Sequence, residues 1–131
     1  MVYVLLGNGF EEVEAITAID YLRRAKISVT TVGIGGREIT GGHGIPVLAD
    51  IEIGQMDLTD LDMIVLPGGL GGVAAISGCE QATQAIRFAW ENDKFVAAIC
   101  AAPTILGEMG LLKGKTAACY PGCEDKLHGA I

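Results

Sequence analysis

The sequence predicts an α/β protein built on a doubly wound, mostly parallel sheet. Short and wholly apolar runs, such as residues 2–6 and 63–66, end in glycine-rich turns, which is typical of strands buried on both faces. Between these runs, apolar residues recur at the three- and four-residue spacing of helices. Strands that alternate with helices form βαβ units on a parallel sheet. The 19 glycines among 131 residues indicate many tight turns and places where the backbone can approach a ligand.

The first half of the chain begins with a predicted strand at residues 2–6. A helix is predicted after Glu12, because apolar positions follow helical spacing and the far end is basic, where cations complement the helix dipole. The apolar positions are Ala15, Ala18, Ile19 and Leu22, and the basic ones are Arg23, Arg24 and Lys26. The remaining predictions are a strand at 27–32 and a turn between strands at 34–37, followed by residues 38–40. A small hairpin is expected next, and after the glycine-rich loop and residues 45–48 a crossover with a partial helical turn at 50–62.

The second half of the chain repeats the alternation of strand and helix. A buried strand at residues 63–66 stops at Pro67-Gly68-Gly69, and a helix is predicted where alanines and Ile86 recur at helical spacing. The remaining predictions are a strand at 95–99, a short helix at 103–109 and the start of one more strand at 116–118. No closing helix follows, so we expect this chain to lack the C-terminal elements of a doubly wound sheet.

Composition narrows the classes of protein to which the chain can belong. Its length fits one domain, and we expect residues 1–131 to form a single unit. Hydrophobic residues make up 50% and the mean hydropathy is +0.44, so a sizeable core can form. The net charge of −7 and the lack of a Lys/Arg cluster argue against nucleic acid as a partner. With no apolar run long enough for a membrane span and no signal peptide pattern, we expect a cytoplasmic protein with reduced cysteines and no membrane partner.

Cys100 is the first candidate catalytic residue. It directly follows the predicted strand 95–99 and precedes a helix that Pro103 begins, so it occupies a strand-to-helix elbow. Ala98 and Ala102 flank it at the two positions where nucleophile elbows need small residues. The helix N-terminus is expected to lower the pKa of the thiol and to favour the nucleophilic thiolate. A small cysteine buried in an apolar strand is the alternative interpretation.

Two further strand ends are expected to meet this elbow, because sites of open α/β sheets lie outside the carboxyl ends of the strands. The backbone N–H groups of residues 67–69, together with that of Ala101, could form an oxyanion hole, although an ordinary turn would have the same sequence. Three acids open the first predicted helix, and most such acids only complement the helix dipole. Glu14 is the one placed to face the crevice and share a proton with the thiolate.

Other residues are candidates for metal ligands or substrate contacts. Cys119, Cys123 and His128 are spaced C-x3-C-x4-H, but a fourth ligand is missing and the spacing is looser than in zinc fingers, so we expect no metal. Phosphate-binding glycine motifs are absent at the strand ends, and we expect no cofactor. His43, in a glycine-rich loop, is either a residue that lines a site or a solvated loop histidine.

Three motifs point to a known family. They are residues 9–15 (Gly-Phe-Glu-Glu-Val-Glu-Ala), 66–69 (Leu-Pro-Gly-Gly) and 97–103 (Ala-Ala-Ile-Cys-Ala-Ala-Pro). In this order and spacing they resemble the ThiJ/PfpI family of the class I glutamine amidotransferase-like superfamily, which includes relatives of protein deglycase. The resemblance runs from Met1 to about Lys126.

The resemblance implies a flavodoxin-like fold, a homodimer and a reactive cysteine at Cys100. It also implies that Glu14 is the partner of this cysteine and that the oxyanion-hole amides belong to Gly69 and Ala101. Members of the family continue beyond the last residue of this chain with further strands and a covering helix, which agrees with the expectation that C-terminal elements are missing here.

Three positions depart from the family pattern. Members with peptidase activity have histidine directly after the cysteine, where this chain has Ala101, which argues against a cysteine peptidase or amidase. Many relatives have histidine before the proline that corresponds to Pro121, and relatives of the deglycase carry an arginine that reaches the site. This chain has Tyr120 and His43 at those positions, and we expect them, with Gly68, to line the substrate site.

These observations predict a cofactor-independent glyoxalase or protein deglycase that acts on small 2-oxoaldehydes or on their adducts. Cys100 would be the nucleophile and Glu14 would move the proton. The alternative is an oxidative-stress sensor or chaperone without turnover, in which Cys100 is oxidised to a sulfinate. A third interpretation is an interaction domain with a vestigial elbow.

Overall fold

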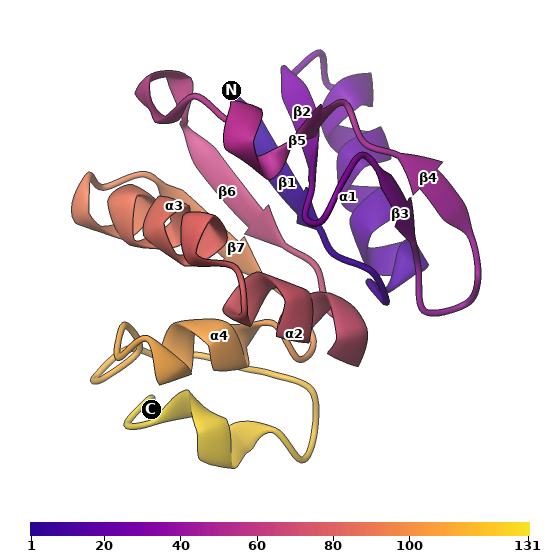
Figure 1. Ribbon diagram of the computed structural model, residues 1–131. Coiled ribbons are helices and arrows are strands. Elements are labelled where there is room, and N and C mark those ends of the chain that lie inside the picture. The colour runs from indigo at the N-terminus through magenta and orange to yellow at the C-terminus, as the bar shows by residue number, and fades with distance from the viewer.

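The centre of the protein is a five-stranded parallel sheet, shown in Figure 1. The computed structural model describes residues 1–131 without a gap. The strands of this sheet are Val2–Leu6 (β1), Val29–Gly33 (β2), Ile51–Glu52 (β5), Met63–Leu66 (β6) and Phe95–Ala98 (β7). They lie in the order β5-β2-β1-β6-β7, and every neighbouring pair is parallel. A small hairpin was expected in this region, and the structure forms it as a separate antiparallel pair of Glu38–Thr40 (β3) and Pro46–Leu48 (β4).

Helices cover both faces of the sheet, as predicted for a doubly wound fold (Figure 1). The α-helices are Glu12–Arg24 (α1), Leu70–Ser77 (α2), Glu80–Glu91 (α3) and Pro103–Glu108 (α4), and the 3₁₀ helices are Ile53–Gln55 (η1), Leu58–Asp60 (η2) and Glu124–Leu127 (η3). Alternate residues of β1 face two separate cores. Val4 packs in one core with Ala15 of α1, and Leu5 packs in the other with Ile86 of α3 and Ile105 of α4. Because both faces of β1 are buried, its sequence is apolar throughout.

Three regions differ from the sequence predictions. The helix α2 begins at Leu70, although Gly71 and Gly72 led us to expect a loop at this point. The glycines instead let this helix approach the turn after β1, since a Cβ at Gly72 would lie 2.8 Å from the Cα of Phe10. The strand predicted at residues 116–118 is wrong, because no strand lies beside this segment and its central N–H donates to the carbonyl of Ile131 instead (3.4 Å). The predicted crossover after the hairpin contains β5 in addition to η1 and η2.

The strand order reverses at β1, and this reversal places the candidate site. The chain leaves β1 to form β2 on one side and returns later to form β6 on the other. Val4 lies opposite Val65, and Leu66 lies opposite Ala98, so β1, β6 and β7 end at the same edge of the sheet. In open α/β sheets the crevice at such a reversal, outside the carboxyl ends of the strands, is where ligands bind.

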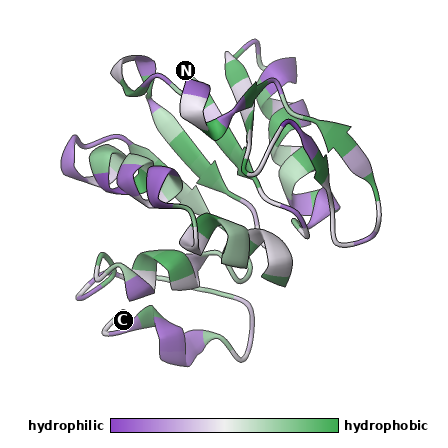
Figure 2. Cartoon of the chain, in the orientation of Figure 1, coloured by the Kyte–Doolittle hydropathy of each residue, from purple (hydrophilic) through white to green (hydrophobic).

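Hydropathy follows this layered arrangement. Figure 2 shows hydrophobic strands at the centre and hydrophilic stretches on outer segments such as η3. The edge strand β7 is the exception, because its first residue, Phe95, is largely exposed. None of the helices combines the length and the apolar character that crossing a membrane requires.

Candidate active site

Cys100 lies on a strained elbow between β7 and α4. Its φ angle is +63°, a left-handed value that residues other than glycine rarely adopt. The turn is closed by the Ala102 N–H, which donates to the carbonyl of Ile99 (3.0 Å). The hydroxyl of Thr104 donates to the carbonyl of Ala101 (2.6 Å) and fixes the first turn of α4. This is the geometry that nucleophile elbows use to expose a reactive side chain.

Glu14 reaches this elbow from the first turn of α1. Its Oε1 accepts the Gly68 N–H at 2.9 Å, and its carboxylate also forms a hydrogen bond with the thiol of Cys100. Only glycine fits between the two groups, because a Cβ at position 68 would lie 2.7 Å from the Cβ of Cys100 and closer still to Glu14. The segments that follow β1, β6 and β7 therefore meet at one point, as predicted.

The environment of Cys100 reverses one expectation from the sequence. Burial raises the pKa of the Cys100 thiol, and the hydrogen bond and negative charge of Glu14 raise it further. The N–H of Ala101 donates to the sulfur and lowers the pKa, but this effect is smaller. The predicted lowering by the helix N-terminus is wrong, because the nearest charged group is negative and α4 is only six residues long. These effects favour the neutral thiol of Cys100 over the thiolate.

A cavity of about 360 Å³ opens in front of Cys100. Its other walls are formed by Glu11, Gly69, Leu70, Ala101, Tyr120 and Cys123. Gly69 has a φ of +87°, and its N–H takes part in no internal hydrogen bond. The N–H groups of Gly69 and Ala101 thus border the cavity, whereas the N–H of Gly68 is already bound to Glu14. An oxyanion could be held by the N–H of Gly69 and by that of Ala101, which here donates to the sulfur of Cys100, but not by the N–H of Gly68.

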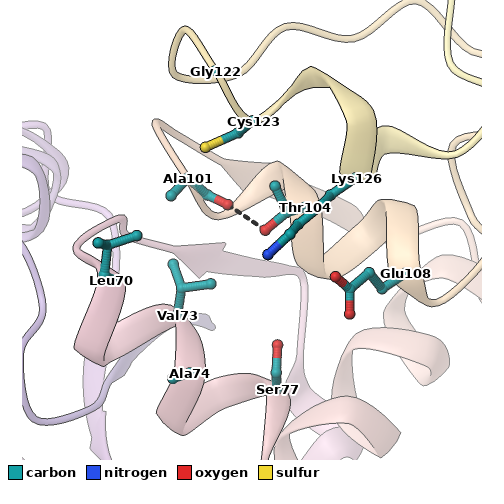
Figure 3. Close-up of a pocket in the computed structure, with 10 residues that line it drawn as sticks. All are labelled: Leu70, Val73, Ala74, Ser77, Ala101, Thr104, Glu108, Gly122, Cys123 and Lys126. Atoms are coloured by element: carbon teal, nitrogen blue, oxygen red, sulfur yellow. Dashed lines mark hydrogen bonds between the residues drawn. The ribbon is translucent and has the colours of Figure 1, made fainter.

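A second cavity, of about 330 Å³, adjoins the first and shares Leu70, Ala101 and Cys123 with it (Figure 3). Its polar groups come from α2, α4 and η3. In Figure 3 the side chain of Lys126 extends toward Thr104. The sulfur of Cys123 points inward, on the side of Ala101. No local pattern marks Leu70, Glu11 or Cys123 as a wall residue, and the spacing of Cys123 suggests only a metal ligand.

The remaining candidates lie at different distances from Cys100. The N–H of Tyr120 donates to the carbonyl of Cys100 (2.7 Å), and its side chain lines the cavity while remaining 58% exposed. His43 lies on the loop between β3 and β4 and borders none of the cavities around Cys100. Cys119, Cys123 and His128 do not come together as a set of metal ligands. Cys119 instead borders a further cavity that includes Glu14 and Cys100.

One set of potential metal ligands does come together, at Glu11, Glu12 and His43, with ligand atoms within 4.8 Å of one another. The oxygens of Glu12 are already engaged. They accept the N–H groups of His43 (2.8 Å) and Ile45 (3.3 Å), and Nδ1 of His43 lies 3.0 Å from Oε1. Burial opposes the charge of Glu12, but these hydrogen bonds outweigh it and hold its pKa below the usual range. The hydrogen bond to Glu12, with the charges of both acids, raises the pKa of His43. The cluster fastens the hairpin loop to α1.

Comparisons with known proteins find relatives along the whole chain. The sequence profile of the DJ-1/PfpI family matches residues 1–131. Protein dj-1beta of Drosophila melanogaster is 38% identical over 125 residues, which cover 95% of this chain and 67% of that protein. A protein named deglycase from Pyrococcus horikoshii is 33% identical over 129 residues, which cover 98% of this chain and 77% of that protein. The structure of oxidized DJ-1 from Toxoplasma gondii superposes with a TM-score of 0.91 at 32% identity, covering 95% of this chain and 69% of that one. The chain spans only 29% and 33% of two Arabidopsis thaliana DJ-1 homologues.

Proposed function

The chain belongs to the DJ-1/PfpI family, and from that premise we propose that it is a cofactor-independent enzyme that uses Cys100 on small 2-oxoaldehydes or on their adducts with amines and thiols. The names of two Pyrococcus relatives, both deglycases, support this class of substrate. The observation that carries the proposal is the hydrogen bond between Cys100 and Glu14 beside a cavity that both residues line. A thiol nucleophile with an adjacent proton carrier is what the chemistry of a 2-oxoaldehyde requires.

The reaction begins when the sulfur of Cys100 attacks the aldehyde carbon and transfers its proton to Glu14. The resulting hemithioacetal carries an oxyanion, to which Gly69 and Ala101 can donate their N–H groups. Glu14 returns its proton to this oxyanion and, as a carboxylate again, moves a proton from the first carbon of the substrate to the second. The hydroxyl proton passes from the oxygen of the first carbon to that of the second, which completes the conversion of the hemithioacetal into a thioester. Water cleaves the thioester, which releases a 2-hydroxy acid and restores the thiol.

The proposal is tested by methylglyoxal consumption with detection of lactate. We expect turnover by the wild-type chain and a loss of at least about 1,000-fold in Cys100→Ser. Cys79→Ser is the matched control, because Cys79 packs against the core and borders no cavity around Cys100. A folded wild type without turnover, or a Cys100→Ser variant with full turnover, would contradict the proposal.

A second candidate function is oxidative sensing without turnover. The description of the Toxoplasma gondii relative as oxidized supports it, as does the carboxylate beside the sulfur. A sulfinate formed at Cys100 could share a proton with Glu14 and accept the N–H of Ala101. Oxidation that is confined to Cys100, in a protein that consumes no methylglyoxal, would favour this function over catalysis.

We further propose that the chain forms a homodimer through an exposed apolar face. On α1 the side chains of Val13, Ile16 and Tyr21 are exposed, and on the hairpin so are Ile45 and Leu48. Exposed apolar patches of this kind usually mark an interface. Sedimentation velocity should give twice the monomer mass of 13.6 kDa, and Val13→Asp should shift the protein toward the monomer. A wild type that stays monomeric at high concentration would contradict the proposal.

A further inference from the structure

We propose that Cys123 is a resolving cysteine, which attacks Cys100 after a hydroperoxide has oxidised it and closes a reversible disulfide across the active-site cavity. The inference rests on the reactivity of Cys100, which the proposed function also requires. It does not depend on turnover of any carbonyl substrate.

The two thiols face the same space. Cys100 and Cys123 both line the 360 Å³ cavity. In Figure 3 the sulfur of Cys123 is directed toward the side of Ala101, the residue that follows Cys100. The charge of a Cys123 thiolate would also act on Cys100, where it adds to the effects that raise the pKa of that thiol.

Backbone hydrogen bonds bring Cys123 back over the elbow. The N–H of Tyr120 donates to the carbonyl of Cys100 (2.7 Å), which anchors the returning chain beside the nucleophile. The N–H of Cys123 then donates to the carbonyl of Tyr120 (3.1 Å), so a tight turn follows at once. Twenty-two residues lie between the two cysteines in the sequence, yet these two hydrogen bonds connect Cys100 to Cys123 through Tyr120 alone.

The two sides of the cavity differ in their freedom to move. Cys100 is held between β7 and α4 in a strained conformation, whereas residues 116–123 form no helix or strand. Gly122 is exposed and has a φ of +98°, and Leu127 anchors the far end of the segment in the core. A disulfide needs the two Cβ atoms about 3.5–4.5 Å apart. If the two Cβ atoms must approach each other to reach this distance, we expect the turn that carries Cys123 to move while the core stays unchanged.

Cys119 is the competing thiol, and its surroundings make it the weaker candidate. It borders a different cavity, which Cys100, Glu14 and Tyr120 also line, and it is absent from the 360 Å³ cavity that Cys123 shares with Cys100. Burial raises the pKa of Cys119, and the neighbouring acids and Cys123 raise it further. A higher pKa lowers the fraction of thiolate available for attack on an oxidised sulfur.

The chemistry uses one hydroperoxide and both thiols. The sulfur of Cys100 attacks the terminal oxygen, the O–O bond breaks, and an alcohol or water leaves, so that Cys100 becomes a sulfenic acid. The sulfur of Cys123 then attacks the sulfur of Cys100, the S–O bond breaks, and the oxygen leaves as water with the proton of the Cys123 thiol. The pair of thiols loses two electrons to the peroxide. A dithiol reductant restores both thiols by exchange.

This disulfide would have two consequences for the site. It would bind the sulfur of Cys100, which could then no longer attack a carbonyl carbon. It would also remove the sulfenic acid before a second peroxide converts it into the irreversible sulfinic acid. Without Cys123 the oxidation of Cys100 should therefore continue to the sulfinic acid.

The test treats the full chain with one equivalent of hydrogen peroxide and measures its intact mass without reduction. We expect a loss of about 2 Da and two fewer alkylated cysteines, both reversed by dithiothreitol. Trypsin places Cys119 and Cys123 in the same peptide, residues 116–126, so peptide mapping of the wild type alone cannot assign the partner. Cys119→Ser should retain the disulfide. Cys123→Ser should lose it and, in excess peroxide, should gain about 32 Da at Cys100.

Three outcomes would overturn the inference. The wild type could gain about 32 Da without a prior loss of 2 Da, or the disulfide could persist in Cys123→Ser and vanish in Cys119→Ser. A Cys100 that is inert toward iodoacetamide would overturn both this inference and the proposed function. A disulfide that forms in a protein without methylglyoxal turnover would contradict only the proposed function and would support the resolving role of Cys123.

Discussion

Glu12 and Glu14 lie two residues apart in the first turn of α1, yet they serve different parts of the molecule. Glu12 is buried and binds the hairpin loop, where it accepts the N–H groups of His43 and Ile45. Glu14 is half-buried and binds the elbow, where it accepts the N–H of Gly68 and meets the thiol of Cys100. One carboxylate fastens two structural elements together, and the other adjoins a nucleophile.

Helix geometry explains this difference. Residues at positions i and i+2 of a helix do not face the same side, so two acids with this spacing meet different neighbours. The partner of each carboxylate, rather than its place in a run of acids, therefore decides its role. The predictions below separate the two roles by experiment.

The largest effect is expected for Glu14→Gln. Glutamine keeps the shape of the side chain and can still accept the Gly68 N–H, but it cannot carry a proton. Methylglyoxal turnover should fall by about 100-fold or more, with the melting temperature nearly unchanged. Glu12→Gln is the matched control, and equal losses of turnover in the two variants would remove the distinction between these acids.

Gly68→Ala should lower both turnover and stability. The added methyl group would overlap the carboxylate of Glu14 and the Cβ of Cys100, so the two groups must move apart. We expect at least about a tenfold loss of turnover and a loss of about 1–3 kcal/mol in the free energy of unfolding, measured by denaturant titration. Gly54→Ala is the control, because the nearest atom to a Cβ there is 3.8 Å away. Full activity in Gly68→Ala would show that the close contact between Glu14 and Cys100 is not needed.

Glu12→Gln should affect stability and leave turnover within about twofold of the wild type. The variant weakens the charge-assisted hydrogen bonds to the loop that carries His43. Thermal unfolding should begin at a temperature a few degrees lower, since the hairpin loop is then held less tightly. A large loss of turnover with unchanged stability would instead place Glu12 in the reaction.

The smallest effect is the pH dependence of the stability that the Glu12–His43 pair contributes to the fold. The lowered pKa of Glu12 means that its contribution is present above the usual value of 4.5 and is lost as the pH falls through the lower folded value. The raised pKa of His43 means that its contribution is complete below 6.5 and is lost as the pH rises through the higher folded value. The difference in melting temperature between wild type and Glu12→Gln should therefore be greatest between these two values. Because the His43 side chain is 70% exposed, the loss at high pH should be modest and weaker in salt. If this difference in melting temperature did not vary with pH, Glu12 and His43 would not stabilise the fold as an ion pair.

Much of the site could be predicted because each part is encoded by local sequence. The apolar strand before Cys100 and Pro103 after it indicate the elbow, and the proline–glycine pair after β6 indicates the turn that carries Gly69. The wall residues Leu70 and Cys123 could not be predicted, because their positions depend on a helix that begins within a glycine-rich stretch and on a loop without regular structure. His43 was placed near the substrate by resemblance, but its Nδ1 lies beside Glu12.

The parallel sheet, the order of its main strands and helices, and the elbow at Cys100 follow from the amino-acid sequence alone, because hydrophobic periodicity and turn residues act over a few neighbouring positions. The packing of remote segments, and no local pattern, buries Cys100 beside Glu14 so that its pKa rises, brings Cys123 to the cavity, and leaves residues 116–118 without a partner strand. These properties depend on distances between segments remote in sequence. Such distances are set when the strand ends pack together, and no local pattern records them.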